Sequence, residues 1–233
     1  TTVIIPESDE YDTLSTDFND LAKLSGVATV RKVFMAALPM PVIVDATDFL
    51  SETIQTPDEL VEGILHRGCK LVLGGGSKTY KTWTLFDLGV SVATGGRWLN
   101  FDCRKGRVLY INFEIQSAFF QKRLKAILDA KQISLKKDCL EIWNLRGHAS
   151  DYISLIPKMI EHSKSRNYSL IIIDPIYKLY GELNENSAGE VAKLLNSIDS
   201  LCIETGAAVA FGAHYSKGNQ ASKESIDRIS GSG

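Results

Sequence analysis

Short apolar runs alternate with segments of helical periodicity along most of the chain. An apolar run followed by a helix and then by another apolar run is typical of βαβ units and a parallel sheet. The predicted strands are the run 71–73, which leads into a group of glycines, and the runs 108–114, 139–145, 169–174 and 207–214. The predicted helices cover residues 83–94, 115–131, 151–166 and 191–205. The pattern therefore predicts an α/β fold in which helices cover both faces of a mostly parallel central sheet.

The N-terminal part of the chain does not follow this pattern. Residues 1–30 carry many acidic and hydroxyl side chains with only short apolar runs, which is typical of an arm rather than a domain. We expect this arm either to pack on a neighbouring subunit or to be a disordered tail. Thr56 and Pro57 have the features of a helix start, and apolar residues follow at helical spacing. The sequence thus predicts an N-terminal arm and lead-in over residues 1–56 and an α/β domain over residues 57–233.

A glycine-rich stretch separates the first predicted strand from the first predicted helix. Residues 75–82 match the phosphate-loop pattern, a glycine, four residues, then glycine-lysine-Ser/Thr, except that Tyr80 occupies the position of the second glycine. The same residues are also compatible with an ordinary turn between a strand and a helix. As a phosphate loop, the stretch would bind nucleotide through Gly75, Gly76, Ser77, Lys78, Thr79, Tyr80, Lys81, Thr82 and Trp83.

The chemistry of a phosphate loop predicts ATP and Mg²⁺ as its ligands. Backbone N–H groups and the positive end of the following helix hold phosphate oxygens, and Lys81 adds a full positive charge. Thr82 would place its hydroxyl on Mg²⁺, because a hard cation that bridges phosphates accepts a neutral oxygen ligand. Since the backbone before the lysine is tight, Tyr80 implies an altered loop or a strain of roughly 1–2 kcal/mol. Lys78 would add compensating positive charge.

Three of the predicted strands end in an ionisable side chain, namely Glu114, Asp174 and His214. In an open α/β sheet the carboxyl ends of the strands line the ligand crevice, so all three are expected beside the phosphate loop. A buried strand that ends in aspartate is suited to hold Mg²⁺ or its water, although strand-end aspartates are also common as caps and turns. His214 is either a structural histidine or a hydrogen-bonding partner of the γ-phosphate.

Composition and charge limit which partners the protein is expected to bind and in which cellular compartment it is expected to work. The 233 residues include 26 basic and 28 acidic side chains, and the formal net charge of −2 indicates no global attraction to nucleic acid. The polar closing segment, which carries Lys217 and Arg228, is either a local contact for a phosphate backbone or an ordinary solvated loop. The four cysteines form no Cys-x-x-Cys pair, which argues against a zinc site and a disulfide framework. No apolar run approaches the roughly 20 residues that span a bilayer, so a cytoplasmic protein without a membrane partner is expected.

Taken in order, these motifs resemble the RecA-like P-loop ATPase core of the RepA-type hexameric helicases and their plasmid and phage relatives. The resemblance spans roughly residues 57–230. Its most specific parts are Val108-Leu-Tyr-Ile-Asn-Phe-Glu114 followed by Arg123, and His214-Tyr-Ser-Lys217. The resemblance implies catalytic or ligand-binding roles for Glu114 (polarising the attacking water), Lys81 and Thr82 (holding phosphates and Mg²⁺), Asp174 (holding Mg²⁺ or its water) and His214 (sensing the γ-phosphate).

The resemblance also implies a homo-oligomeric ring in which each ATP site is completed by the neighbouring subunit. Arg123 and Arg228 are the predicted inter-subunit cations, and the arginine finger of the family is expected beyond Gly233, where we expect the polypeptide to continue. The first hypothesis for the function is an ATP-driven motor that moves on single-stranded DNA. The alternatives are a nucleotide-dependent switch or assembly protein with little turnover, and a recombination accessory that coats DNA as a filament.

Overall fold

A computed structural model of the chain describes residues 41–148, 151–181 and 188–214. The chain divides into two compact units, Thr1–Gln55 and Thr56–Gly233. In the first unit, the short helix α3 (Ala46–Ser51) begins after Asp45, whose carboxylate accepts a hydrogen bond from the backbone N–H of Thr47 at 2.8 Å. The described side chains of this unit are exposed.

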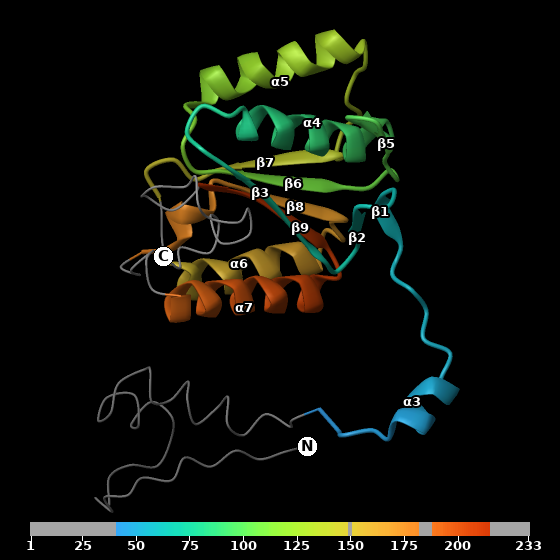
Figure 1. The fold of residues 1–233 in the computed structure, drawn as a ribbon. Helices are drawn as coiled ribbons and strands as arrows, with labels where there is room; N and C mark the ends of the chain where they lie inside the picture. Colours follow the sequence, from blue (N-terminus) through green and yellow to red (C-terminus); the bar gives the residue numbers. More distant parts are fainter. Residues whose placement is uncertain (1–40, 149–150, 182–187, 215–233) are drawn as a thin grey trace, which may run out of the picture. The chain divides into compact units, whose positions relative to one another are not determined.

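A five-stranded parallel sheet forms the centre of the second unit, with the strand order β3-β9-β8-β6-β7 (Figure 1). The strands are β3 (Lys70–Gly75), β6 (Val108–Asn112), β7 (Leu140–Asn144), β8 (Leu170–Asp174) and β9 (Ala208–His214). Every residue of β6 and β8 is buried, as expected for parallel strands that are covered on both faces. The predicted α/β fold is confirmed, and it is consistent with a RecA-like P-loop core.

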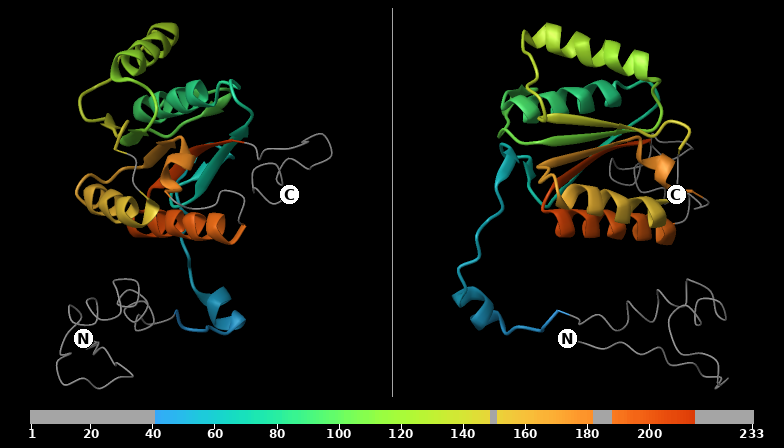
Figure 2. Two further views of the ribbon diagram at one scale, coloured as in Figure 1. Left: turned by 90° about the vertical axis from the view of Figure 1, so that its left-hand side faces the viewer. Right: turned by 180° about the vertical axis from the view of Figure 1, so that it is seen from behind.

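Helices cover both faces of this sheet (Figures 1 and 2). One side carries α4 (Lys81–Thr94) and α5 (Ser117–Lys131), and the other carries α6 (Tyr152–Lys164) and α7 (Ala188–Thr205). Because side chains alternate along a strand, Tyr110 of β6 belongs to the core beneath α4, whereas Leu109 and Ile111 belong to the core against α6 and α7. No helix within the described residues is both long and apolar enough to cross a membrane.

Two short antiparallel hairpins accompany the sheet. They pair β1 (Glu59–Val61) with β2 (Leu65–His66), and β4 (Arg97–Trp98) with β5 (Phe101–Asp102). The first hairpin lies where a helix is predicted from Thr56, so that prediction is wrong. The adjacent residues Leu60 and Val61 are both buried, and Gly63 turns the chain with φ of 65°. The backbone N–H of residue 62 donates to the carbonyl oxygen of residue 102 at 3.0 Å, so contact between the two hairpins outweighs the local helical signal.

The strand register brings the carboxyl ends of the strands to one edge of the sheet. Asn112 pairs in register with Asp174 on one side and with Asn144 on the other, and Gly75 pairs with His214. Strand β6 ends two residues earlier than the apolar run predicts, so Glu114 lies in the loop that follows the strand. The phosphate loop and the predicted carboxylates therefore approach one another at this edge.

Candidate functional site

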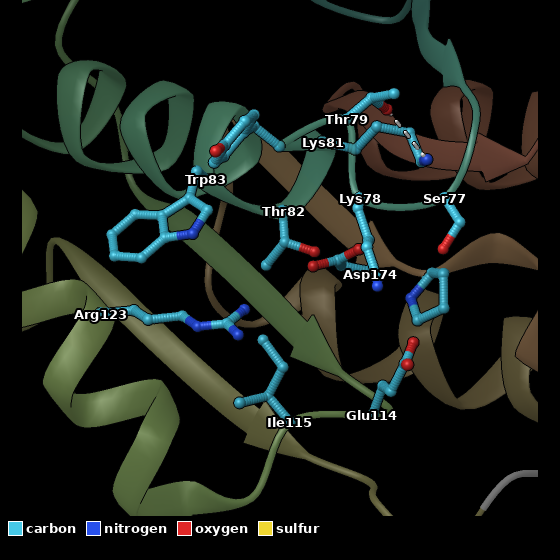
Figure 3. A pocket seen from close by; sticks show the side chains of 12 residues that line it. Ser77, Lys78, Thr79, Lys81, Thr82, Trp83, Glu114, Ile115, Arg123 and Asp174 are labelled. Carbon is cyan, nitrogen blue, oxygen red and sulfur yellow. Dashed lines mark hydrogen bonds between the residues drawn. The ribbon is translucent and has the colours of Figure 1, made fainter.

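A pocket of about 420 Å³ opens at the carboxyl edge of the sheet (Figure 3). Its lining consists of residues 77–83, Glu114, Ile115, Arg123, Asp174 and Pro175. Gly75 and Gly76 line an adjoining hollow of about 250 Å³ that shares Thr79 and Lys81 with the pocket. Side chains from the phosphate loop, from the loop after β6, from α5 and from the end of β8 thus face one space.

Lys81 is the first residue of α4, and its ammonium group contacts the loop that precedes the helix. Nζ donates to the carbonyl oxygens of Gly75 at 2.8 Å and Gly76 at 2.6 Å. Burial lowers the pKa of Lys81, whereas the negative charges of Asp174 and Glu114 raise it. A phosphate that bound to Lys81 would have to compete with these two carbonyl oxygens.

The backbone of the loop is left-handed at two residues that are not glycine. Lys78 and Tyr80 both have φ of 62°, a region that costs an L residue about 1–2 kcal/mol. Tyr80 is the N-cap of α4, makes no side-chain capping hydrogen bond and is 74 % exposed. Tyr80 therefore has a left-handed backbone that favours glycine, which agrees with the strain that is one of the two possibilities predicted from the sequence at this position. A Cβ atom at Gly75 would lie 2.6 Å from Thr79 Oγ1, so a larger residue there would force the Thr79 side chain to move.

Asp174 ends β8 and is only 5 % exposed. The Tyr110 hydroxyl donates to its Oδ2 at 2.8 Å, and the Thr82 hydroxyl lies close enough to the same carboxylate to lower its pKa. Burial raises the pKa of Asp174, and the interactions with Tyr110 and Thr82 oppose that shift. Tyr110 is in turn fixed between Phe86, with ring centroids 4.9 Å apart, and Phe120, at 5.1 Å. Asp174 is thus a buried carboxylate that is oriented before any ligand arrives.

The oxygen atoms around Asp174 fit the requirements of Mg²⁺. Mg²⁺ usually takes one or two protein oxygen ligands besides phosphate and water. The Thr82 hydroxyl and the Asp174 carboxylate lie next to each other in the pocket, so one small cation can reach both (Figure 3). Thr82 and Asp174 are therefore the residues that would hold the metal.

Glu114 lies in the loop between β6 and α5, and its side chain is exposed. Figure 3 shows its carboxylate and the Lys78 side chain pointing into the pocket from opposite sides. The hydroxyl of Tyr177, from the 3-10 helix η1 (Ile176–Leu179), donates to Glu114 Oε2 at 3.4 Å. Burial raises the pKa of Tyr177, and the negative charge of Glu114 raises it further, so the phenol stays protonated as a donor.

Arg123 extends from α5 into the same pocket (Figure 3). Its guanidinium carbon lies 5.6 Å from the ring centroid of Trp83, within the range of a cation–π contact. The positive charge of Arg123 lowers the pKa of Asp174, against the larger effect of burial. Arg123 therefore faces the site of its own chain, and its role as an inter-subunit cation stays a prediction.

Two polar residues of the site, Tyr110 and Asn112, are absent from the sequence-based prediction. Both lie inside the otherwise apolar run 108–114, and both are 1 % exposed. A polar group in a buried strand is tolerated when it has a hydrogen-bond partner, so two polar residues in such a run are the signal that predicts a neighbouring polar site. The two polar residues do not, however, show which groups they bond to or what the polar site does.

The remaining predicted site residues lie at or beyond the limit of the described chain. His214 ends β9 and pairs with Gly75, which brings its backbone to the phosphate-loop edge of the sheet. The side chain of His214, as well as Lys217 and Arg228, lies outside the part of the chain that the structure describes.

Comparison with known proteins gives a family that agrees with this geometry. The model of the AAA_25 family, described as an AAA domain, matches residues 37–220 of the 233 residues. The match spans the phosphate loop and both carboxylates of the pocket. No curated protein matches the chain. Because the family model covers well over half of the sequence, the chain belongs to the AAA_25 family of AAA domains.

Proposed function

We propose that the protein hydrolyses Mg-ATP in this pocket and that it is a replicative DNA helicase or translocase of the RepA type. Membership of the AAA domain family supports the general part of the proposal, a nucleotide-binding P-loop ATPase. The observation that carries the proposal is the convergence of Lys81, Asp174 and Glu114 on one pocket. Phosphoryl transfer to water needs a cation for the phosphates, a ligand for the metal and a base for the water, and these three side chains match those needs.

Nucleotide binding is the task of the loop and of the residues beneath it. Lys81 leaves the carbonyl oxygens of Gly75 and Gly76 and binds phosphate oxygens, and the N-terminus of α4 adds partial positive charge. Thr82 and Asp174 would hold the metal. When bound, Mg²⁺ neutralises part of the charge that develops on the phosphates.

The chemical step is assigned to the opposite side of the pocket. Glu114 accepts a proton from the attacking water, for which its exposed carboxylate has direct access to solvent. Arg123 faces the same space and offsets negative charge on the transferring phosphoryl group. His214, by the resemblance to RepA-type helicases, hydrogen-bonds the γ-phosphate from the end of β9.

The ring, the DNA substrate and the helicase activity rest on the resemblance to RepA-type helicases. The run 108–114 that ends in Glu114, Arg123 after it, and the run 214–217 support that resemblance. Lys217 and Arg228 are the proposed contacts with single-stranded DNA or with the nucleotide of a neighbouring subunit.

The test is steady-state ATP hydrolysis by the wild-type protein and by Glu114→Gln, with and without single-stranded DNA. We expect turnover in the variant to fall about 10²–10⁴-fold while nucleotide affinity stays unchanged, because the amide cannot accept the proton. Glu161→Gln, which changes an exposed carboxylate on α6, is the matched control and keeps wild-type turnover. Full turnover in Glu114→Gln would remove Glu114 from the mechanism. Turnover that single-stranded DNA does not stimulate would contradict the motor.

A nucleotide-dependent switch with little turnover is the second candidate function. Tyr80 in the place of the second phosphate-loop glycine and the low net charge favour this alternative, whereas Glu114 argues against it, because a protein that only binds nucleotide needs no carboxylate to activate water. Nucleotide binding without measurable hydrolysis in the wild-type protein would support it.

A further inference from the structure

Asn112 is the last residue of β6 and is 1 % exposed. A carboxamide offers two N–H donors and an oxygen that accepts two hydrogen bonds. In Asn112, both N–H donors and both acceptor positions of the oxygen are occupied. Oδ1 accepts from the backbone N–H of Glu114 at 3.3 Å and of Ile115 at 2.9 Å. Nδ2 donates to the carbonyl oxygen of Ile115 at 2.6 Å and to Oδ1 of Asn144 at 2.8 Å.

Three of these four hydrogen bonds go to the backbone of the loop that carries Glu114. A single buried side chain holds the N–H of Glu114 together with both the N–H and the carbonyl of Ile115. The partners also determine which way the carboxamide faces, since two N–H groups meet its oxygen and two oxygens meet its nitrogen. The fourth bond, to Asn144 at the end of β7, ties this arrangement to the neighbouring strand.

The side chain of Glu114 needs such support. It is exposed, and its hydrogen bond from Tyr177 is long at 3.4 Å, so this contact orients it only weakly. A base that takes a proton from water must be held within a fraction of an ångström of its working position. The backbone beneath Glu114 therefore has to supply most of the orientation.

We propose that Asn112 is a positioning residue for Glu114 and that Asn144 locks the Asn112 carboxamide in its working orientation. The inference rests on the proposed function, because it presupposes that Glu114 acts on the attacking water. Asn112 lies behind the loop and does not line the pocket, so it acts through Glu114 rather than on the substrate.

The test compares Asn112→Ala with Asn196→Ala, which removes an exposed asparagine side chain on α7. We expect Asn112→Ala to lower kcat about 10–100-fold, as misplacement of a catalytic group does, and to change nucleotide affinity by less than about twofold. The control keeps wild-type values. A purely structural role of Asn112 would instead weaken nucleotide binding along with turnover. Wild-type kcat in Asn112→Ala overturns the proposal.

A double-mutant cycle separates positioning from general damage. In the Glu114→Gln background, measured in single-turnover assays, Asn112→Ala should cause no further loss, because the group that it positions is already gone. An equal loss in both backgrounds overturns the proposal. Wild-type protein without turnover, or Glu114→Gln with full turnover, would overturn the proposed function and this inference together. An inactive Glu114→Gln beside a fully active Asn112→Ala would overturn this inference alone.

Asn144→Ala keeps the test decisive if Asn112→Ala does not fold. Asn144 is exposed at the end of an edge strand, so its truncation should leave the fold intact. The loss of one hydrogen bond to the carboxamide should lower kcat about two- to fivefold with unchanged nucleotide affinity. Wild-type kcat in Asn144→Ala overturns the proposal if Asn112→Ala does not fold, and it overturns the locking role of Asn144 if Asn112→Ala folds and loses turnover.

Discussion

The two walls of the pocket are held by different kinds of contact. The loop wall, residues 75–82, is held by its own groups, because Lys81 donates to the carbonyls of Gly75 and Gly76. The strand wall, formed by the ends of β6 and β8, is held from behind. Tyr110 orients Asp174, and a buried carboxamide orients the loop after β6. A phosphate would displace the contacts of the loop wall, whereas most contacts of the strand wall persist when a ligand binds.

Because the two walls are held differently, we expect one to govern nucleotide affinity and the other to govern catalysis. A wall that must exchange its internal hydrogen bonds for those of a ligand reduces the apparent affinity, because part of the binding free energy goes into the rearrangement. A wall that is oriented in advance needs no reorganisation during the reaction. We therefore expect changes in the loop wall to alter nucleotide affinity and changes in the strand wall to alter turnover or metal dependence.

The largest effect is expected when the cation of the loop wall is removed. Lys81→Ala should weaken ATP binding about 10²–10⁴-fold, because one or two charge-assisted hydrogen bonds to phosphate are lost. The measurement is a fluorescence titration with a labelled ATP analogue. Lys125→Ala, at an exposed position on α5, is the control and should bind normally. Unchanged affinity in Lys81→Ala would show that residues 75–82 are an ordinary turn.

Asp174→Asn tests the strand wall. We expect turnover to fall about 10²–10³-fold with the dependence on Mg²⁺ concentration largely abolished, because the amide is a poor ligand for a hard cation. ATP hydrolysis across a Mg²⁺ titration measures this effect. A variant with the Mg²⁺ dependence of the wild type would remove Asp174 from the metal site.

The same variant also has a predicted pH signature in the ligand-free protein. Burial raises the pKa of Asp174 above its value in the unfolded chain, about 3.9. The stability that this group contributes is therefore complete below the unfolded pKa and is lost as the pH rises through the folded pKa. Asp174→Asn has no such loss, so its free energy of unfolding, relative to that of the wild type, should increase from pH 4 to pH 7. Denaturant unfolding at several pH values measures the difference, and a constant difference would contradict the raised pKa.

Relief of strain in the loop wall should have a smaller effect. Tyr80→Gly should tighten ATP binding about five- to tenfold, because glycine makes more backbone conformations available to the loop as Lys81 changes partners. Tyr80→Ala is the matched control: it removes the ring but keeps the Cβ atom that disfavours φ of 62°. If backbone strain limits affinity, only the glycine variant binds more tightly. If the ring obstructs the pocket, both variants do, and a loss of affinity in both would show that the ring contributes to binding.

The fold is predictable from the sequence wherever the apolar residues of a segment by themselves show which element it forms. Strands β6 and β8 are mostly apolar because both faces of the sheet are covered, and the glycine-rich spacing of residues 75–82 predicts the loop between β3 and α4. The β1–β2 hairpin is not predictable in this way, since Leu60 and Val61 are buried through contact with a distant hairpin. The helical spacing of apolar residues after Thr56 gives no information about contact with the second hairpin.

The site is predictable to a similar extent. The strand-end rule brings both Asp174 and Glu114 to the pocket, since parallel strands end at one edge of the sheet. The supporting contacts are not predictable, because they join residues far apart in the sequence. Tyr110 reaches Asp174 across 64 positions and Asn112 reaches Asn144 across 32. These contacts depend on the strand order β8-β6-β7, which the apolar pattern does not specify.

The smallest effect is expected when the hydrogen bond from Tyr177 to Glu114 is removed. Tyr177→Phe deletes the hydroxyl that donates to Glu114 Oε2 at 3.4 Å. Because a hydrogen bond of this length on an exposed carboxylate is weak, kcat should fall only about two- to threefold, with unchanged ATP affinity. The measurement is steady-state hydrolysis beside Asn112→Ala, whose loss of turnover should be clearly larger. A loss in Tyr177→Phe as large as that in Asn112→Ala would mean that η1, rather than the buried end of β6, orients the carboxylate of Glu114.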